Sequence, residues 1–316
     1  MSVMKQTAFP FERVFVLNLD RRPDRLRFIR EQLFDRAGLL PYAARIQRVA
    51  AVDGEKLISS RFSKSPTQLF RVGFLSKLGA RRLRETDPSR KVWGMDLNPA
   101  AVGCALSHIE LWARIAALSA SFSFFSSSSS SVLSSSSPSR TCYLVLEDDS
   151  LLPENFLECY RARVAGIPTV EMGWELLYLS GIDAAGEKQK NELQIAPGIS
   201  RVSQLHRTTN AYVLTPRGAK TLLEGCLPLT FQLDTMMTIK VGNPKRGGEA
   251  LSHPPPPCGV KKEESKALFV QEPRCLTLQP PLIVQESRMG SDIQTPPPSS
   301  FVSSSGLATS SSSFSS

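Results

Sequence analysis

The chain has 316 residues, 41% of them apolar, and is long enough to bury the core of one large domain or two small ones. Its net charge of +9 comes from residues 1–91, which hold 20 Lys and Arg against 9 Asp and Glu. This basic third suits an anionic ligand such as a nucleotide diphosphate, or consists of solvated helix faces. The basic residues are not interleaved with stacking aromatics, which argues against nucleic-acid binding.

The six cysteines include no C-x-x-C pair, so neither a zinc site nor a disulfide framework is indicated. No stretch reaches the roughly 20 apolar residues of a membrane-spanning helix. Met1–Arg13 has no apolar run of the length of a signal peptide. The compartment therefore stays open: cytoplasmic for the chain as written, and the endoplasmic reticulum or Golgi lumen if the N-terminus is incomplete.

The first hundred residues begin with a predicted strand-turn-helix unit. Residues 14–19 form a short apolar run typical of a buried parallel strand, and Pro23 opens the helix that follows. A second strand is predicted over 45–51, closed by a turn at 52–54. From 57 to 95 the pattern is weak and basic, which indicates mixed helix and loop.

A long core helix is predicted next. Asn98-Pro99 combines a capping residue with a first-turn proline, and apolar residues recur at helical spacing as far as Ala116. The continuation over 119–139 has 14 serines in 21 positions and no apolar periodicity. We expect a disordered, serine-rich insertion there.

Three further strands are predicted at 142–146, 174–179 and 211–214, with short helices after Pro153 and Thr215-Pro216. Strands that alternate with helices predict an α/β fold with a mostly parallel sheet flanked by helices.

The C-terminal part changes in character. Residues 242–265 have the Gly/Pro-rich composition of a loop, and 268–271 and 282–285 indicate short edge elements. The predicted organisation is a flexible N-terminus (1–12), a single domain (13–294) and a disordered Pro/Ser-rich tail (295–316).

The most conspicuous chemical feature is the triplet Glu147-Asp148-Asp149, which directly follows an apolar strand. Ligands of open parallel sheets bind outside the carboxyl ends of the strands, where three acids are costly to place without a cation. Residues two apart on a strand face the same way, so we expect Glu147 and Asp149 to share a ligand. Carboxylate oxygens suit Mg²⁺ or Mn²⁺ bridged to a diphosphate. The competing interpretation is an acidic turn that caps the next helix.

Other polar residues each have a functional and a structural interpretation. His108, beside Ser107, lies at the edge of the apolar face of its helix, where a lone histidine is more often structural than catalytic. Asn18, at the end of the first strand, either bonds a base or ribose or caps the next turn. Asp234 either serves an acceptor hydroxyl as base or caps residues 235–239.

Several segments resemble, in their order and spacing, glycosyltransferase family 25, which includes bacterial lipooligosaccharide transferases and procollagen galactosyltransferases. The resembling segments are VLNLDRRPDR (16–25), AAVDG (50–54), VGCALSH (102–108), the strand with Glu147-Asp148-Asp149, TNAY (209–212), PRGAK (216–220), Asp234 and the closing segment 281–294. Each motif alone is weak, whereas their common order over 13–118, 141–240 and 267–294 is specific.

The resemblance implies a GT-A type, Rossmann-like fold that uses a nucleoside-diphosphate sugar, expected to be UDP-galactose, together with Mn²⁺ or Mg²⁺. Carried over by position, it implies donor-binding residues Asn18, Arg25, Asp53, Ser107, His108 and Glu147, metal ligands Glu147 and Asp149, and catalytic residues Asp149 and Asp234. The expected function is metal-dependent transfer of a hexosyl, foremost galactosyl, group to a hydroxyl of a glycan or glycoprotein.

Two departures from the family leave an alternative open. The serine-rich insertion separates the helix with Ser107 and His108 from the acidic strand, at a closure cost that grows only logarithmically with length. Residues 242–265 fall where part of the acceptor side is expected. A catalytically inactive, glycosyltransferase-like binding protein is therefore the alternative. A metal-dependent phosphohydrolase is disfavoured, because the His/Asp cluster of two-metal hydrolases is absent from the sequence pattern.

Overall fold

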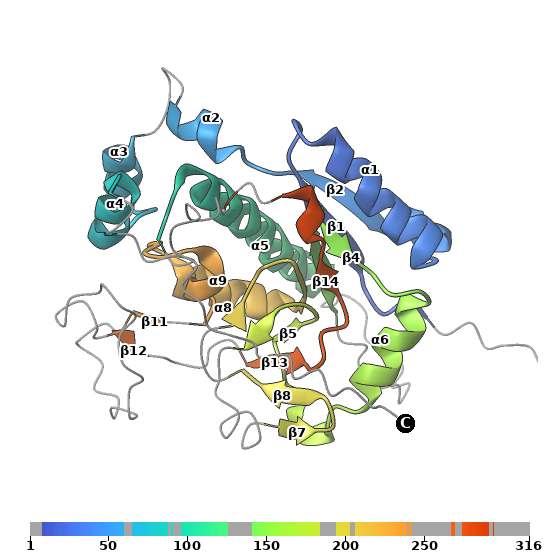
Figure 1. Ribbon diagram of the computed structural model, residues 1–316. Helices are drawn as coiled ribbons and strands as arrows, with labels where there is room; N and C mark the ends of the chain where they lie inside the picture. Colours follow the sequence, from blue (N-terminus) through green and yellow to red (C-terminus); the bar gives the residue numbers. More distant parts are fainter. Residues whose placement is uncertain are drawn as a thin grey trace, which may run out of the picture.

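The computed structural model describes residues 8–59, 65–87, 90, 96–125, 141–183, 194–202, 206–238, 240–241, 267–268, 274–290 and 293. These residues form three layers, with an eight-stranded sheet between two layers of helices (Figure 1). The strand order is β2-β1-β3-β10-β5-β13-β8-β7. The predicted loop at 242–265 and tail at 295–316 lie outside the described residues.

The strands of the sheet are short and mostly aligned. They are β1 (Arg13–Asn18), β2 (Ile46–Ala50), β3 (Tyr143–Glu147), β5 (Leu176–Tyr178), β7 (Gln194–Ala196), β8 (Ile199–Arg201), β10 (Ala211–Leu214) and β13 (Cys275–Leu278). Strand β1 is parallel to β2 and β3, and β5 is parallel to β13, whereas β10 and β8 are antiparallel to their neighbours. Only β10 and β8 thus run against the other six strands, which confirms the predicted α/β fold with a mostly parallel sheet.

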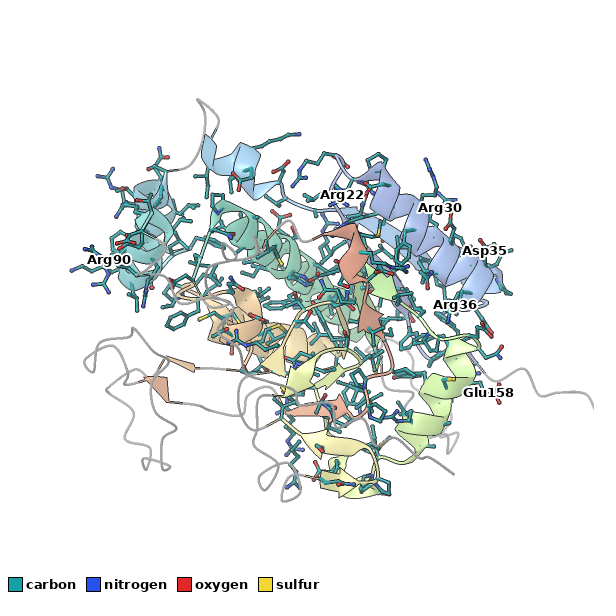
Figure 2. All side chains as sticks on the ribbon, viewed as in Figure 1. Arg22, Arg30, Asp35, Arg36, Arg90 and Glu158 are labelled. Carbon is teal, nitrogen blue, oxygen red and sulfur yellow. The ribbon has the colours of Figure 1, made fainter. Side chains whose placement is uncertain are left out.

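Alternate residues of the central strands enter two different cores. Phe15 of β1 packs with the layer of α5 (Pro99–Phe125), α8 (Pro216–Cys226) and α9 (Leu233–Met236). Val14 and Val16 pack with α1 (Pro23–Glu31) and α6 (Phe156–Ala165) on the other face. This period of two is what a strand buried on both faces requires. Charged side chains such as Arg30, Asp35 and Arg36 project outward from α1 and the π-helical turn after it (Figure 2).

The remaining elements are smaller. They are the 3-10 turns 40–45, 169–171 and 287–289, helices α2 (Gly54–Ser59), α3 (Pro66–Arg71) and α4 (Lys77–Arg84), and the strand pairs β4–β14 (Ser150–Leu151, Val284–Gln285), β6–β9 (Ile182–Asp183, His206–Arg207) and β11–β12 (Lys240–Val241, Ala267–Leu268).

The predicted caps are present. The Asn98 Oδ1 atom accepts the backbone N–H of Ala101 at 2.7 Å and starts α5, and the Thr215 side chain accepts that of Gly218 and starts α8. Helix α5 continues to Phe125, seven residues into the segment predicted as a serine-rich insertion. The rest of 119–139 lies outside the described residues.

Helix α5 is the central helix of the core. By length and composition Pro99–Leu118 is capable of crossing a membrane, but 56% of that segment is buried inside the fold, with Trp112 and Ile115 fully enclosed. A buried core helix meets the same criterion, so the hydropathy of α5 is explained by its contacts with the sheet.

The structure differs from the sequence prediction at β13, which was not predicted although it lies between β5 and β8. Its residues, Cys-Leu-Thr-Leu, form a four-residue run with a proline on either side, at 273 and 280. So short a run does not distinguish a strand from an apolar loop.

Two glycines allow the loop after β2 to touch α5. A Cβ atom on Gly103 would lie 2.4 Å from the Val52 carbonyl oxygen and 2.5 Å from the Gly54 nitrogen. We expect Gly103→Ala to lower the free energy of unfolding by about 1–3 kcal/mol, because backbone atoms must move to admit the methyl group. Gly225→Ala, where a Cβ meets nothing within 4 Å, is the matched control and should gain up to about 1 kcal/mol from helix propensity. Urea denaturation followed by circular dichroism measures both, and equal effects would contradict the close-contact explanation.

Candidate functional site

The carboxyl edge of the sheet carries three adjoining pockets. The central pocket, with a cavity volume of about 100 Å³, lies between the ends of β1–β3 and helix α5. A second, of about 600 Å³, shares Cys104 and Glu147 with it. A third, of about 440 Å³, shares Arg21 and Asp53 with the central one. The three form a series along the edge where ligands of such sheets bind.

Sheet register explains why these residues meet. Asn18 pairs with Ala50 on one side, and its neighbour Leu17 pairs with Glu147 on the other. Asn210, immediately before the antiparallel strand β10, accepts the backbone N–H of Glu147 at 2.8 Å. The ends of β1, β2 and β3 and the beginning of β10 are therefore at one level, and they present their polar side chains together.

Six of the eight sequence-predicted site residues line the central pocket, and their functional roles stay predictions. The six are Arg25, Asp53, Ser107, His108, Glu147 and Asp149. Asp234 lines the larger pocket with Glu147. Asn18 supports the site from behind, where its side-chain amide donates to Asp148 Oδ2 at 2.7 Å and its Oδ1 accepts from Arg48 at 2.9 Å.

Arg25 binds two members of the acidic triplet at once. Its Nη1 atom lies 3.0 Å from Asp148 Oδ1 and 3.3 Å from Asp149 Oδ2, and all three residues are buried. Strand β3 ends at Glu147, so the alternation expected through the triplet does not extend to the two aspartates. Asp148 is consequently held together with Asp149 by one guanidinium group rather than facing elsewhere.

Glu147 is the most accessible acid of the triplet, with 18% of its side chain exposed. Its Oε1 atom accepts hydrogen bonds from the Thr209 hydroxyl and, at 3.2 Å, from His108 Nε2. Because Tyr212 accepts the indole N–H of Trp112 at 2.8 Å, its own proton is directed to His108 Nδ1, also at 2.8 Å. This assigns the proton of His108 to Nε2, and a chain of buried hydrogen bonds orients Glu147 from within the core.

The three acids differ in proton affinity. Burial opposes ionisation of Glu147, but hydrogen bonds from His108 and Thr209 outweigh it and lower its pKa. Burial raises the pKa of Asp148 despite Asn18 and Arg25. Burial and the charge of Glu147 raise the pKa of Asp149 to about 6. The cluster is therefore anionic at neutral pH, and Asp149 holds its charge least firmly.

Ser107 and Asp53 shape the wall of the pocket. The Ser107 hydroxyl accepts the backbone N–H of Val52 at 2.8 Å and donates to the Gly103 carbonyl at 2.7 Å, which fixes the loop after β2 against α5. Asp53 pairs with Arg21 at 3.0 Å and accepts the backbone N–H of Lys56 at the start of α2. These contacts stabilise the local structure, and both Ser107 and Asp53 line the central pocket.

Asp234 is held by a strained loop. Its Oδ2 atom accepts the backbone N–H of Thr208 at 3.1 Å, and its Oδ1 accepts that of Thr235 at 2.7 Å. Thr208 has φ +86°, a costly conformation for a β-branched residue that is maintained mostly at functional sites. Burial raises the pKa of Asp234 despite the hydrogen bonds that its carboxylate accepts from Thr208 and Thr235.

The sequence prediction missed two residues that hold Asp149. The side-chain amide of Asn210 donates to Asp149 Oδ1 at 2.8 Å, and that of Gln285 donates to Oδ2 at 3.0 Å. Asn210 lies in a segment that supported the family resemblance, before a predicted strand, and this position was a usable signal. Gln285 lies 136 positions from Asp149. It belongs to the closing segment 281–294 that also supported the resemblance, but nothing in that segment indicated a contact with Asp149.

The chain matches the family model described as "Glycosyltransferase family 25 (LPS biosynthesis protein)" over residues 11–237. It is 29% identical over 225 residues to "Probable inactive glycosyltransferase 25 family member 3" of Rattus norvegicus, and 28% identical over 213 residues to "Inactive glycosyltransferase 25 family member 3" of Homo sapiens. These matches cover 69% and 67% of this chain but only 31% and 29% of the two relatives. Because the family model covers well over half of the chain, the protein belongs to glycosyltransferase family 25.

Proposed function

We propose that this chain binds a nucleoside-diphosphate sugar in the cleft formed by the three adjoining pockets. It transfers the hexosyl group to a hydroxyl of a glycan or glycoprotein, with UDP-galactose as the expected donor. One observation carries the proposal: Glu147 borders both the pocket with the acidic cluster and the larger pocket with Asp234. A sugar held at the cluster therefore lies next to a carboxylate with raised proton affinity.

The donor half of the proposal rests on the central and third pockets. Arg21 borders both and offers a cation to a diphosphate, while Asp53 beside it offers an acceptor for ribose hydroxyls. His108 and Ser107 lie beneath and keep Glu147 and the Val52 loop in place. Donor binding of this kind uses fixed groups at the carboxyl edge of the sheet, as in other open α/β folds.

The residues also fit a divalent cation, which we assign to Glu147 and Asp149. Three carboxylates and one guanidinium leave a net charge of −2 in a largely buried cluster. The buried Oδ1 atom of Asn210, next to Asp149, accepts no hydrogen bond from the residues that the structure describes. An all-oxygen donor set suits Mn²⁺ or Mg²⁺. When bound, the ion would offset the charge that develops on the departing diphosphate.

The acceptor half assigns Asp234 as general base. An acceptor hydroxyl in the larger pocket gives its proton to the Asp234 carboxylate while its oxygen forms the bond to the anomeric carbon. The bond from that carbon to the diphosphate breaks, and the electron pair leaves with the diphosphate. The backbone N–H groups of Thr208 and Thr235 donate to the Asp234 carboxylate and hold it in one orientation. A fixed orientation favours the proton transfer.

The proposal is tested by UDP release. Purified protein with Mn²⁺ and a panel of UDP-sugars should release UDP, slowly by donor hydrolysis and faster with an acceptor. Asp149→Asn should abolish release, and Asp234→Asn should lower the acceptor-stimulated rate by about 10²–10⁴-fold. Asp24→Asn, which removes an exposed acid on α1, should change neither. Release that survives a chelator would overturn the metal assignment.

A second candidate is a binding protein without turnover. The two relatives named above are described as inactive, and the candidate base Asp234 already accepts a backbone hydrogen bond at each oxygen. On this alternative, calorimetry shows UDP binding that Asp149→Asn weakens, while wild type releases no UDP with any donor. The two measurements together decide between the candidates.

A further inference from the structure

A cysteine, a histidine and a glutamate converge where the central pocket meets the 600 Å³ pocket. Cys104 and His108 are four residues apart on α5 and therefore lie on the same side of that helix, while Glu147 comes from the end of β3. One ligand atom from each of the three, Sγ, a ring nitrogen and a carboxylate oxygen, lies within 4.8 Å of the other two. The spacing of the cysteines in the sequence did not indicate this set, because Glu147 lies 39 positions after His108.

We propose that Cys104, His108 and Glu147 form a site for a thiophilic divalent cation such as Zn²⁺. Thiolate, imidazole and carboxylate are the three ligand types that zinc takes in proteins, and three protein ligands with one open position are typical of accessible zinc sites. Thiolate also favours zinc over Mn²⁺ or Mg²⁺, which prefer the all-oxygen set around Asp149. The two sets differ in chemistry and share only Glu147.

The surroundings support binding from the cleft. Cys104 and Glu147 are only partly buried, and both border the central and the 600 Å³ pockets, so an ion and its fourth ligand have access. The other nitrogen of His108 bonds the Tyr212 hydroxyl at 2.8 Å, the kind of outer contact that orients metal-bound histidines. Glu147, being 18% exposed, is able to adjust its rotamer around an ion.

Binding redistributes two protons. The Cys104 thiol loses its proton to solvent as sulfur bonds to the ion, and the His108 proton moves from Nε2 to Nδ1, so that Nε2 becomes a ligand. The histidine then donates to Tyr212 instead of accepting from it. Because Glu147 belongs to both sets, zinc and the hard cation exclude each other. This last consequence, zinc as an antagonist of donor binding, rests on the proposed function, whereas the site does not.

Co²⁺ is the probe, because its spectrum reports its ligands. The protein background is Cys159→Ser/Cys258→Ser, which removes the helix α6 thiol and the cysteine outside the described residues. We expect one Co²⁺ per chain, with an intense thiolate charge-transfer band and the visible bands of four-coordinate cobalt. Cys104→Ser should abolish the charge-transfer band, and Tyr212→Phe should weaken binding by roughly 10–100-fold. Zn²⁺ should displace the bound Co²⁺, and Mn²⁺ at equal concentration should not.

Asp149→Asn is the control that separates the two metal sites, because it alters the oxygen set and should keep the charge-transfer band. If the three residues form a hydrogen-bonded cluster that binds no ion, wild type shows no charge-transfer band, and the inference is overturned. A band that persists in Cys104→Ser also overturns it. Absence of the band together with Mn²⁺-dependent UDP release would overturn this inference alone. A band without UDP release would leave the zinc site and contradict the transferase.

Discussion

Replacing Arg25 by methionine is expected to lower the free energy of unfolding by about 3 kcal/mol at pH 7 and by less than 2 kcal/mol at pH 5. Arg25 is buried between Asp148 and Asp149, which are 5% and 2% exposed, at 3.0 and 3.3 Å. Methionine keeps much of the side-chain volume and removes the charge. Among the described residues, the remaining side-chain donors to the two carboxylates are the neutral amides of Asn18, Asn210 and Gln285, so the ionised carboxylates lose most of their stabilisation.

The pH dependence follows because an unpaired buried carboxyl takes up a proton. Holding a carboxyl of ordinary pKa 3.8 in its protonated form costs about 4 kcal/mol at pH 7 and less than 2 kcal/mol at pH 5, which limits the loss. Wild type already bears part of this cost, since burial raises the pKa of Asp149 to about 6. Most of the loss therefore comes from Asp148, whose pKa is also raised by burial.

The matched control is Arg21→Met. Arg21 pairs with Asp53 at 3.0 Å, but its side chain is 37% exposed, so the pair is screened by water and its loss should cost about 1 kcal/mol or less. Urea unfolding followed by circular dichroism, with chelator present, measures both variants. A loss for Arg25→Met that is the same at pH 5 and pH 7 would show that packing, and not the buried charges, is what the arginine provides.

The sequence predicted the framework because period and capping are local signals. The buried run of β1, the asparagine cap of α5 and the threonine cap of α8 each depend on residues within one turn or strand. Strand β13 was missed, because its place between β5 and β8 depends on pairing with residues about a hundred positions away. The predicted end of helix α5 came too early, because the high serine content of the following segment was given more weight than the continuation of the helix.

The site was predictable in its members and not in their contacts. A strand followed by acids indicates a ligand edge, so the triplet was found, but the alternation rule failed where β3 ended at Glu147. That Arg25 joins Asp148 to Asp149, and that Asn210 and Gln285 complete the shell of Asp149, are consequences of tertiary packing. No local pattern encodes which arginine enters a buried cluster.

A second large effect is expected from His206, outside the cleft. His206 is fully buried, stacked on Tyr178 with ring centroids 3.9 Å apart, and burial lowers its pKa to about 3. Between pH 6.5 and 3 the unfolded chain binds a proton that the folded protein does not. The free energy of unfolding therefore falls by about 1.4 kcal/mol for each pH unit below 6.5 on account of this residue.

Asp149 has the opposite effect in an overlapping range. Its folded pKa of about 6 exceeds the ordinary 3.8, so the folded protein binds the extra proton, and its contribution to stability rises as pH falls from 6 to 4. With chelator present, the two contributions should largely cancel in wild type between pH 4 and 6. Removing either group should then reveal the slope of the other.

The experiment compares wild type, His206→Gln and Asp149→Asn by urea denaturation at several pH values. Relative to wild type, His206→Gln should gain about 2–3 kcal/mol of stability between pH 6.5 and 4.5, and Asp149→Asn should lose a similar amount between pH 6 and 4. Parallel profiles for all three proteins would contradict both shifted pKa values. If only one variant diverges from wild type, only the pKa shift of the group it removes is supported. Opposite slopes from the two variants are expected only if burial acts on both groups, because it disfavours the charged form of a histidine and of a carboxyl alike.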